Sequence, residues 1–115
     1  MLKVTPADLV KLGELYLAEG SWHGRRIVPA EWVRTSTSPV ELATQDGSSY
    51  GLLWWLLELD GHPAHAAIGS SGQGVLVVPD LHLVVAVSSR DDGPLPLELE
   101  MLLPLLTDVI MPAVA

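Results

Sequence analysis

The residues best placed to do chemistry lie in one glycine-rich stretch, Gly69-Ser70-Ser71-Gly72-Gln73-Gly74. A serine hydroxyl is a weak nucleophile until a neighbouring base activates it, and His65 stands just upstream. The stretch does not match Gly-x-Ser-x-Gly, because position 73 is glutamine, and it does not match a phosphate loop, because no lysine follows the glycines. One hypothesis is a hydrolase in which Ser70 or Ser71 acts with His65, and the alternative is a plain glycine-rich hairpin.

Two histidines offer a second kind of chemistry. His62 and His65 are spaced as i and i+3, which a metal ion could use if both lay on one helix. They flank Pro63 after a turn, however, and no cluster of carboxylates stands beside them in the sequence. His82 is expected to be exposed at the start of a strand, and Asp91-Asp92 is typical of a solvated loop. We therefore predict no metal site and no cofactor.

Composition limits the classes of protein that this chain can be. The 115 residues suffice for a single domain, 1–115, and 49% of them are hydrophobic, which argues against disorder. Only six Lys and Arg stand against a net charge of −8, so we expect no nucleic-acid partner. Cysteine is absent, which excludes disulfides and thiolate metal sites. Met1 leads directly into a polar helix start, so no signal peptide is predicted.

Helix signals stand at both ends of the chain. Thr5-Pro6-Ala7-Asp8 predicts a helix start with Thr5 as its cap, and Gly20 is a plausible stop. Ser21 to Val28 is predicted as a loop, and a second helix beginning at Pro29 is expected to turn Trp32 and Val33 inward. Ser36 to Ser49 is predicted as a surface loop. Leu95 to Ala115 is very apolar but carries Glu98, Glu100, Pro104 and Asp108, which favours a core-packed helix over a membrane span.

The middle of the chain has the pattern of a sheet. Strands are predicted in the apolar runs Tyr50–Leu59, Ala64–Ile68, Val75–Val78 and Leu81–Ser88, with turns at Asp60-Gly61 and Pro79-Asp80. Trp54 and Trp55 should point to opposite faces of their strand, one into the core and the other under a helix. Consecutive strands joined by short turns predict an α+β fold, with an antiparallel sheet of three to four strands flanked by helices.

Four stretches, in this order, resemble one family. They are Thr5-Pro6-Ala7-Asp8-Leu9-Val10-Lys11-Leu12-Gly13, Ile27-Val28-Pro29-Ala30-Glu31-Trp32-Val33, Tyr50-Gly51-Leu52-Leu53-Trp54-Trp55, and Gly69-Ser70-Ser71-Gly72-Gln73 followed by Val77-Val78-Pro79-Asp80 and Leu83-Val84-Val85. Together they resemble the C-terminal portion of the β-lactamase-related serine hydrolases, which include class C β-lactamases, penicillin-binding proteins and esterases. The resemblance covers nearly the whole chain and implies part of a β-lactamase/transpeptidase-like fold.

In that family, catalysis uses a Ser-x-x-Lys pair, a Tyr-x-Asn element and a strand, typically Lys-Thr-Gly, that lends a backbone N–H to the oxyanion hole. The first is absent here, because the only lysines are Lys3 and Lys11 and Asp8 stands three residues before Lys11; the second is absent because the chain has no asparagine. The resemblance places the third element at Ala67-Ile68-Gly69, with Ala67 replacing the usual Lys or His. It also implies that Ser70 N–H points toward the oxyanion and that Gln73 belongs to the same substrate strand.

These observations favour a fragment of a serine hydrolase that is not catalytic alone. The intact family hydrolyses esters, β-lactams or amides, and the sequence does not choose among them. The expected partners are the missing N-terminal hydrolase segment or a second copy of the chain. The alternative is a free-standing binding or interaction domain that reuses this piece of fold.

Overall fold

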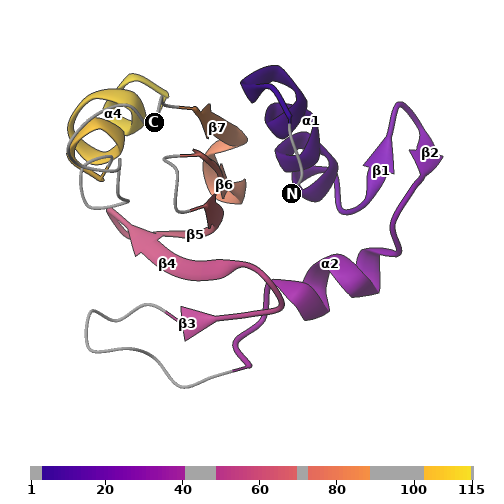
Figure 1. The fold of residues 1–115 in the computed structure, drawn as a ribbon. Helices are drawn as coiled ribbons and strands as arrows, with labels where there is room; N and C mark the ends of the chain where they lie inside the picture. The colour runs from indigo at the N-terminus through magenta and orange to yellow at the C-terminus, as the bar shows by residue number, and fades with distance from the viewer. Residues whose placement is uncertain (1–3, 41–48, 70–72, 89–102, 115) are drawn as a thin grey trace.

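The computed structural model describes residues 4–40, 49–69, 73–88 and 103–114 of the chain. Its first part carries two helices and a small hairpin, and its second part carries the main sheet (Figure 1). The elements are α1 (Pro6–Leu17), β1 (Ser21–Trp22), β2 (Arg25–Arg26), α2 (Ala30–Ser36), β3 (Ser49–Tyr50), β4 (Trp55–Leu59), β5 (His62–Gly69), β6 (Gln73–Val78), the 3₁₀ turn η1 (Pro79–Leu81), β7 (Leu83–Val87), the π-helical stretch η2 (Leu106–Ile110) and α4 (Met111–Val114).

The main sheet is an antiparallel meander in the order β3-β4-β5-β6-β7. Each strand pairs with the next along the chain, as local hairpins require. The β4–β5 turn holds Asp60 at φ 51° and Gly61 at φ 83°, which are the positive values of a type I′ turn, and this turn prediction is confirmed. The α+β fold with an antiparallel sheet is confirmed too, with five strands.

Helices cover both faces of this sheet, so the core lies in two layers (Figure 1). On one face, Tyr16 of α1 and Val33 of α2 pack with Trp54 and Val75. The other face packs against the C-terminal helical segment, residues 103–114, and its cluster of buried residues is Leu59, Ala64, Ala66, Leu76, Val78, Leu106 and Met111. β6 carries three buried valines, Val75, Val77 and Val78, because β-branched side chains pack well on a pleated surface between two helical layers.

Helix α1 begins where the sequence predicts. The Thr5 hydroxyl accepts a hydrogen bond from the backbone N–H of Asp8 at 3.2 Å, and Pro6 occupies the first helical position. The helix ends at Leu17, and the chain turns through Gly20 at φ 93°. Gly13 lies against the sheet so closely that a β-carbon there would collide with Val84 Cγ1. Glycine therefore sets how near the helix approaches β6 and β7.

Three expectations about local structure were wrong. The predicted loop from Ser21 to Val28 contains a small hairpin, β1–β2, with Gly24 at φ 79° in its turn. The single strand Tyr50–Leu59 is two strands, because the chain turns where Gly51 N–H donates to Trp54 O at 2.8 Å and Leu53 adopts φ 70°. The predicted strand Leu81–Ser88 is shorter, because Leu81 belongs to η1 and His82 takes a left-handed φ of 48°.

Two tryptophans also differ from expectation. Trp32 is 47% exposed whereas Val33 is buried, because neighbouring residues on a helix point about 100° apart and α2 turns Val33 and Ser36 inward. Trp54 and Trp55 do lie on opposite sides, with Trp54 in the core. Trp55 packs edge-on against Tyr50 at 4.9 Å between ring centroids and stays 37% exposed, so it does not lie under a helix.

The remaining expectations fall partly outside the described residues. These are most of the loop from Ser36 to Ser49, the Asp91–Pro94 loop and the first part of the helix from Leu95. Residues 103–114 are helical, as predicted, and Leu106 and Met111 bury the apolar side. Within the part of the chain that the structure describes, no helix is both long and apolar enough to cross a membrane.

Candidate functional site

The candidate substrate strand lies at the end of the β5–β6 hairpin. Ala67 pairs with Val75, Ile68 with Gly74, and Gly69 with Gln73. This end of β5 pairs with β6 alone, because the pairing of β5 with β4 covers His62 to Ala66 and stops before Ala67. Ser70, the proposed oxyanion donor, lies outside the described residues. The hairpin therefore brings together Gly69 and Gln73, the residues that flank it on either strand.

Alternation along the two strands separates the candidate residues. Ala67 faces α1 and packs against the cluster around Tyr16, whereas Ile68 faces the C-terminal helical segment. Both are half-buried, and only Gly69 and Gln73 are exposed. The side chains of Ala67 and Ile68 thus belong to the core layers. A substrate at this strand could contact its backbone, Gly69 and Gln73.

Gly69 differs from the tightly packed glycines of this fold. A β-carbon built there would meet only Gln73 O, at 3.7 Å, which is an ordinary van der Waals contact. Its φ is not among the positive values of the chain. Nothing within the described structure therefore requires glycine at position 69, and a residue without a side chain leaves open space above the strand.

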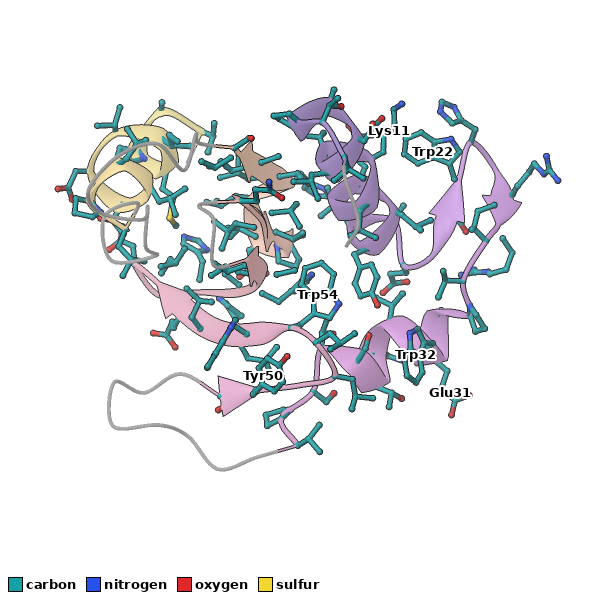
Figure 2. All side chains as sticks on the ribbon, viewed as in Figure 1. Lys11, Trp22, Glu31, Trp32, Tyr50 and Trp54 are labelled. Carbon is teal, nitrogen blue, oxygen red and sulfur yellow. The ribbon has the colours of Figure 1, made fainter. Side chains whose placement is uncertain are left out.

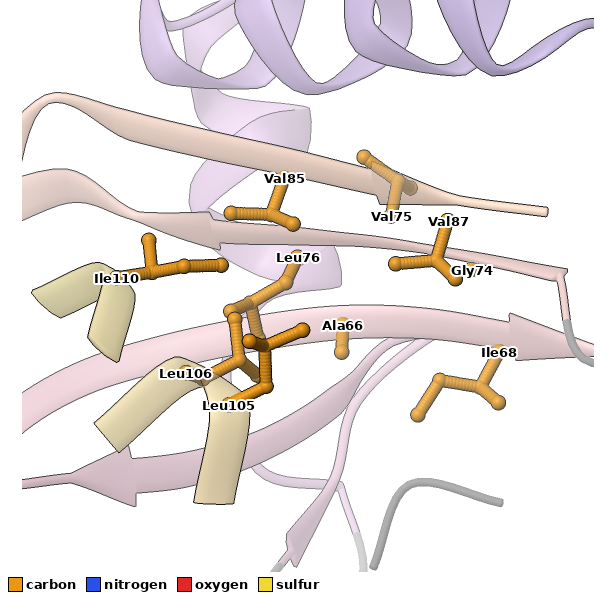
Figure 3. A pocket seen from close by; sticks show the side chains of 10 residues that line it. All are labelled: Ala66, Ile68, Gly74, Val75, Leu76, Val85, Val87, Leu105, Leu106 and Ile110. Carbon is orange, nitrogen blue, oxygen red and sulfur yellow. The ribbon is translucent and has the colours of Figure 1, made fainter. Parts of the chain in front are cut away.

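An apolar cleft lies on the other face of the same hairpin (Figure 3). Its lining includes Ile68, Val87 and Leu105, from three different elements, and carries almost no polar surface. The space is about 30 Å³, which is enough for one or two water molecules and too small for a substrate. We regard this cleft as imperfect packing between sheet and helix.

The histidines do not form a metal site. His62 and His65 point to opposite faces of β5, because i and i+3 fall on different sides of a strand. His62 Nδ1 lies 3.6 Å from Asp80 Oδ2, whereas His65 is 8% exposed beneath α1. Among the described residues, no group of three or more metal-ligating side chains comes together.

His65 is the one strongly perturbed titratable group of the described structure. Burial lowers the pKa of its imidazole to about 4, so the ring is neutral at physiological pH. Its Nε2 atom is buried and has no hydrogen-bond partner. The two serines proposed as its nucleophilic partners, Ser70 and Ser71, lie outside the described residues.

Sequence reasoning missed a buried pair of hydroxyls between α1 and α2. Tyr16 Oη lies 2.9 Å from Ser36 Oγ, and the Ser36 hydroxyl also lies 2.8 Å from Trp32 O, to which it donates. Since Ser36 has one hydroxyl proton, Tyr16 is the donor to Ser36. The two residues lie 20 positions apart, and the sequence predicts a loop at Ser36, so no local pattern indicates this contact. A hollow of about 420 Å³ opens beside Tyr16, Arg34 and His65.

Of the comparisons with known proteins, only the one with solved structures found matches. No protein-family model matches the chain. No curated protein matches it either. Among solved structures, 25 chains match. One is named "Putative 6-aminohexanoate-dimer hydrolase from Bacillus anthracis", with a TM-score of 0.62 and 26% sequence identity over 77% of this chain.

The match covers 24% of that protein, so the present chain spans about a quarter of the length of the structure that it resembles. The Bacillus anthracis protein is a hydrolase of the β-lactamase/transpeptidase-like family. The similarity therefore supports that family and a partial β-lactamase-like fold for the present chain.

Proposed function

We propose that this chain is the C-terminal part of a serine hydrolase of the β-lactamase-related type and that it does not catalyse hydrolysis alone. The observation that carries the proposal is the match of 77% of this chain to about a quarter of a much longer hydrolase. The four sequence stretches that resemble the family lie in the same order along the chain. Substrates would be esters, β-lactams or amides.

The missing family motifs support the proposed inactivity of the isolated chain. A family nucleophile needs the Ser-x-x-Lys pair, and no lysine of this chain has a serine three residues before it. Tyr-x-Asn is excluded by the lack of asparagine. The described hydroxyl pair, Tyr16 and Ser36, is buried between two helices, and Ser36 donates to a backbone carbonyl and not to a lysine or histidine base. We therefore expect the catalytic serine to come from another polypeptide segment.

The contribution of this chain would be one wall of the active site. The end of β5 pairs with β6 as far as Gly69 and Gln73, and this pairing would orient a backbone N–H there. Open space above Gly69 leaves room for a substrate. A rigid backbone donor that faces a developing oxyanion typically contributes about 3–4 kcal/mol to the transition state. Ser70 N–H is the donor that the family pattern implies.

A partner for this chain would pair with β7. In the described structure β7 has one neighbouring strand, β6, and its residues Leu83–Val87 are all apolar and half-buried. Such an edge favours pairing with another strand. We propose that the N-terminal hydrolase segment, or else a second copy, occupies it. The isolated chain should self-associate or melt at low temperature; a monodisperse monomer with a steep, high-temperature melt would count against this.

The test of inactivity uses the isolated chain. We expect no turnover of chromogenic β-lactams or nitrophenyl esters, and no mass increase after incubation with a fluorophosphonate or a penicillin. Covalent labelling of one serine, measured by intact-mass spectrometry, would overturn the proposal. A Ser70→Ala variant then tells whether Ser70 is the labelled residue and whether the hypothesis of Ser70 or Ser71 acting with His65 gains.

The test of the active-site wall uses a chimera in which this chain replaces the matching quarter of the Bacillus anthracis protein. Ser70→Pro removes the proposed N–H, and we expect about 100-fold or greater loss of activity. Ser70→Ala keeps the N–H and should retain activity. If Ser70→Pro folds and stays fully active, Ser70 is not the oxyanion donor.

A free-standing interaction domain remains the second candidate, because one exposed apolar hollow supports it. Leu12, Leu15, Trp22 and Ile27, with Lys11 at the rim, line a hollow of about 420 Å³ between α1 and the small hairpin. Exposed apolar patches commonly mark interaction sites. An adjacent reading frame that encodes Ser-x-x-Lys would favour the hydrolase fragment, and an inactive but well-folded chimera would favour the interaction domain.

A further inference from the structure

His65 occupies an unusual position for a histidine. It lies in the middle of β5, paired with Leu56 on one side and Val77 on the other, and only 8% of its surface is exposed. Its ring stands perpendicular to the indole of Trp54, with 5.0 Å between centroids, and lies 6.0 Å from the ring of Tyr16. Figure 2 shows Trp54 between the sheet and the helices, on the side of α1.

Within the described structure, His65 is not charge-compensated. Among the residues that the structure describes, no ion pair includes His65, and its Nε2 has no hydrogen-bond partner. The titratable and charged groups on this side are Tyr16 of α1, Glu19 after α1, Arg34 of α2 and Glu58 of β4; Glu19 and Arg34 line the same hollow as His65, and Glu58 is exposed. A proton on His65 would therefore create a buried cation that forms no ion pair with a described carboxylate.

The same aromatic group joins three elements. Tyr16 belongs to α1, packs on Trp54 at 4.6 Å between ring centroids, and donates to Ser36 of α2. His65 lies beneath this contact on β5, so its environment includes the surface where both helices meet the sheet. A change in charge at His65 acts directly on the packing of α1 and α2 and hardly on the opposite layer.

We propose that His65 makes the attachment of α1 and α2 to the sheet sensitive to acid, because protonation places an unpaired charge beneath Tyr16 and Trp54. Burial lowers the pKa of His65 to about 4, in agreement with this geometry. A pKa lower in the folded than in the unfolded chain means that the unfolded chain binds more protons. Stability is then lost as the pH falls below the ordinary histidine value of 6.5, and the loss levels off near the folded pKa.

The test compares melting of the 115-residue chain with that of two variants, from about pH 7 to about pH 4.5. Between these two pH values, protonation of His65 should lower the equilibrium constant for folding by roughly 50-fold. This loss adds to the effect of the carboxylates. His65→Gln removes the titration and should remove that part of the pH dependence, whatever its effect on stability at neutral pH. His82→Asn is the matched control at an exposed position, since asparagine tolerates its left-handed backbone.

Two further measurements on the wild-type chain test the proposal even if His65→Gln does not fold. An NMR titration of the wild-type His65 ring should show a midpoint near the value of about 4, and a midpoint at 6.5 or above would overturn the proposal. Hydrogen exchange should show that α1 and α2 lose protection at low pH before residues 103–114 do. Equal loss in both layers would mean that the carboxylates as a whole cause the acid sensitivity.

Discussion

Gly13 and Gly69 are two glycines whose surroundings are opposite. A β-carbon at Gly13 would collide with Val84 and crowd Val75, because α1 lies directly on the sheet there. A β-carbon at Gly69 would touch only one carbonyl oxygen, at 3.7 Å. The first glycine is explained by the packing of this chain. The second has no such explanation within the described residues, and we expect one from a substrate or partner segment at the end of the β5–β6 hairpin.

This difference separates the needs of folding from the needs of the proposed site. Residues in the two core layers respond to substitution through stability, whether or not another segment is present. The end of the hairpin should respond through activity, and only after a nucleophile has been supplied. Variants in the core layers should therefore change the melting temperature of the chain. Variants at the end of the β5–β6 hairpin should change the rate of hydrolysis.

The largest effect is expected for Gly69→Val in the chimera with the Bacillus anthracis protein. The valine side chain would occupy the open space above the strand, and a small misplacement of the substrate can cost about 100-fold in rate. The melting temperature should stay unchanged, since the described structure has room for the side chain. Gly69→Ala is the matched control and should lose less. Full activity of the valine variant would show that substrate does not pass this position.

Gly13→Val should have the next largest effect, and on stability. The side chain has no room between α1 and Val84, and overpacking of this kind costs about 1–3 kcal/mol. Replacing a helical glycine gains up to about 1 kcal/mol in helix propensity, which offsets part of the loss. Urea unfolding should show a lower midpoint for Gly13→Val than for Gly13→Ala. Equal or higher midpoints for both would mean that α1 does not lie as close to the sheet as we describe.

The sequence predicted the parts of this fold that depend on local signals. The N-cap at Thr5 and the turn at Asp60-Gly61 could be read directly, because each depends on a few adjacent residues. The break between β3 and β4 could not, since it depends on Leu53 in a left-handed conformation that leucine rarely adopts. The family resemblance places the candidate site at this hairpin, and that assignment stays a prediction. The sequence did not show that the side chains of Ala67 and Ile68 pack into the two core layers.

A smaller effect is expected for Tyr16→Phe, which removes one hydrogen bond between α1 and α2. Ser36 keeps its bond to Trp32 O, so no buried donor is left unpaired, and the loss should be about 1 kcal/mol. Thermal unfolding of the variant measures this. Tyr16→Phe should cause no such loss of stability in a Ser36→Ala background, because the Tyr16 hydroxyl then has no Ser36 hydroxyl as its partner. Independent, additive losses in the double variant would argue against the Tyr16–Ser36 bond.

The smallest effect is expected for Trp32→Ala, and the adjacent Val33→Ala provides the comparison. Trp32 is the larger side chain but stays 47% exposed, whereas Val33 is 6% exposed and packs in the cluster with Tyr16 and Trp54. Removing an exposed side chain typically changes stability by less than about 0.5 kcal/mol. Removing the buried valine methyl groups should cost about 1–2 kcal/mol, at roughly 0.8 kcal/mol for each group. Size alone would predict the reverse order, so the two melting temperatures decide which side of α2 faces the sheet. If Trp32→Ala proves the more damaging, the helix is rotated from its described orientation, and the tryptophan belongs to the core as its sequence pattern predicted.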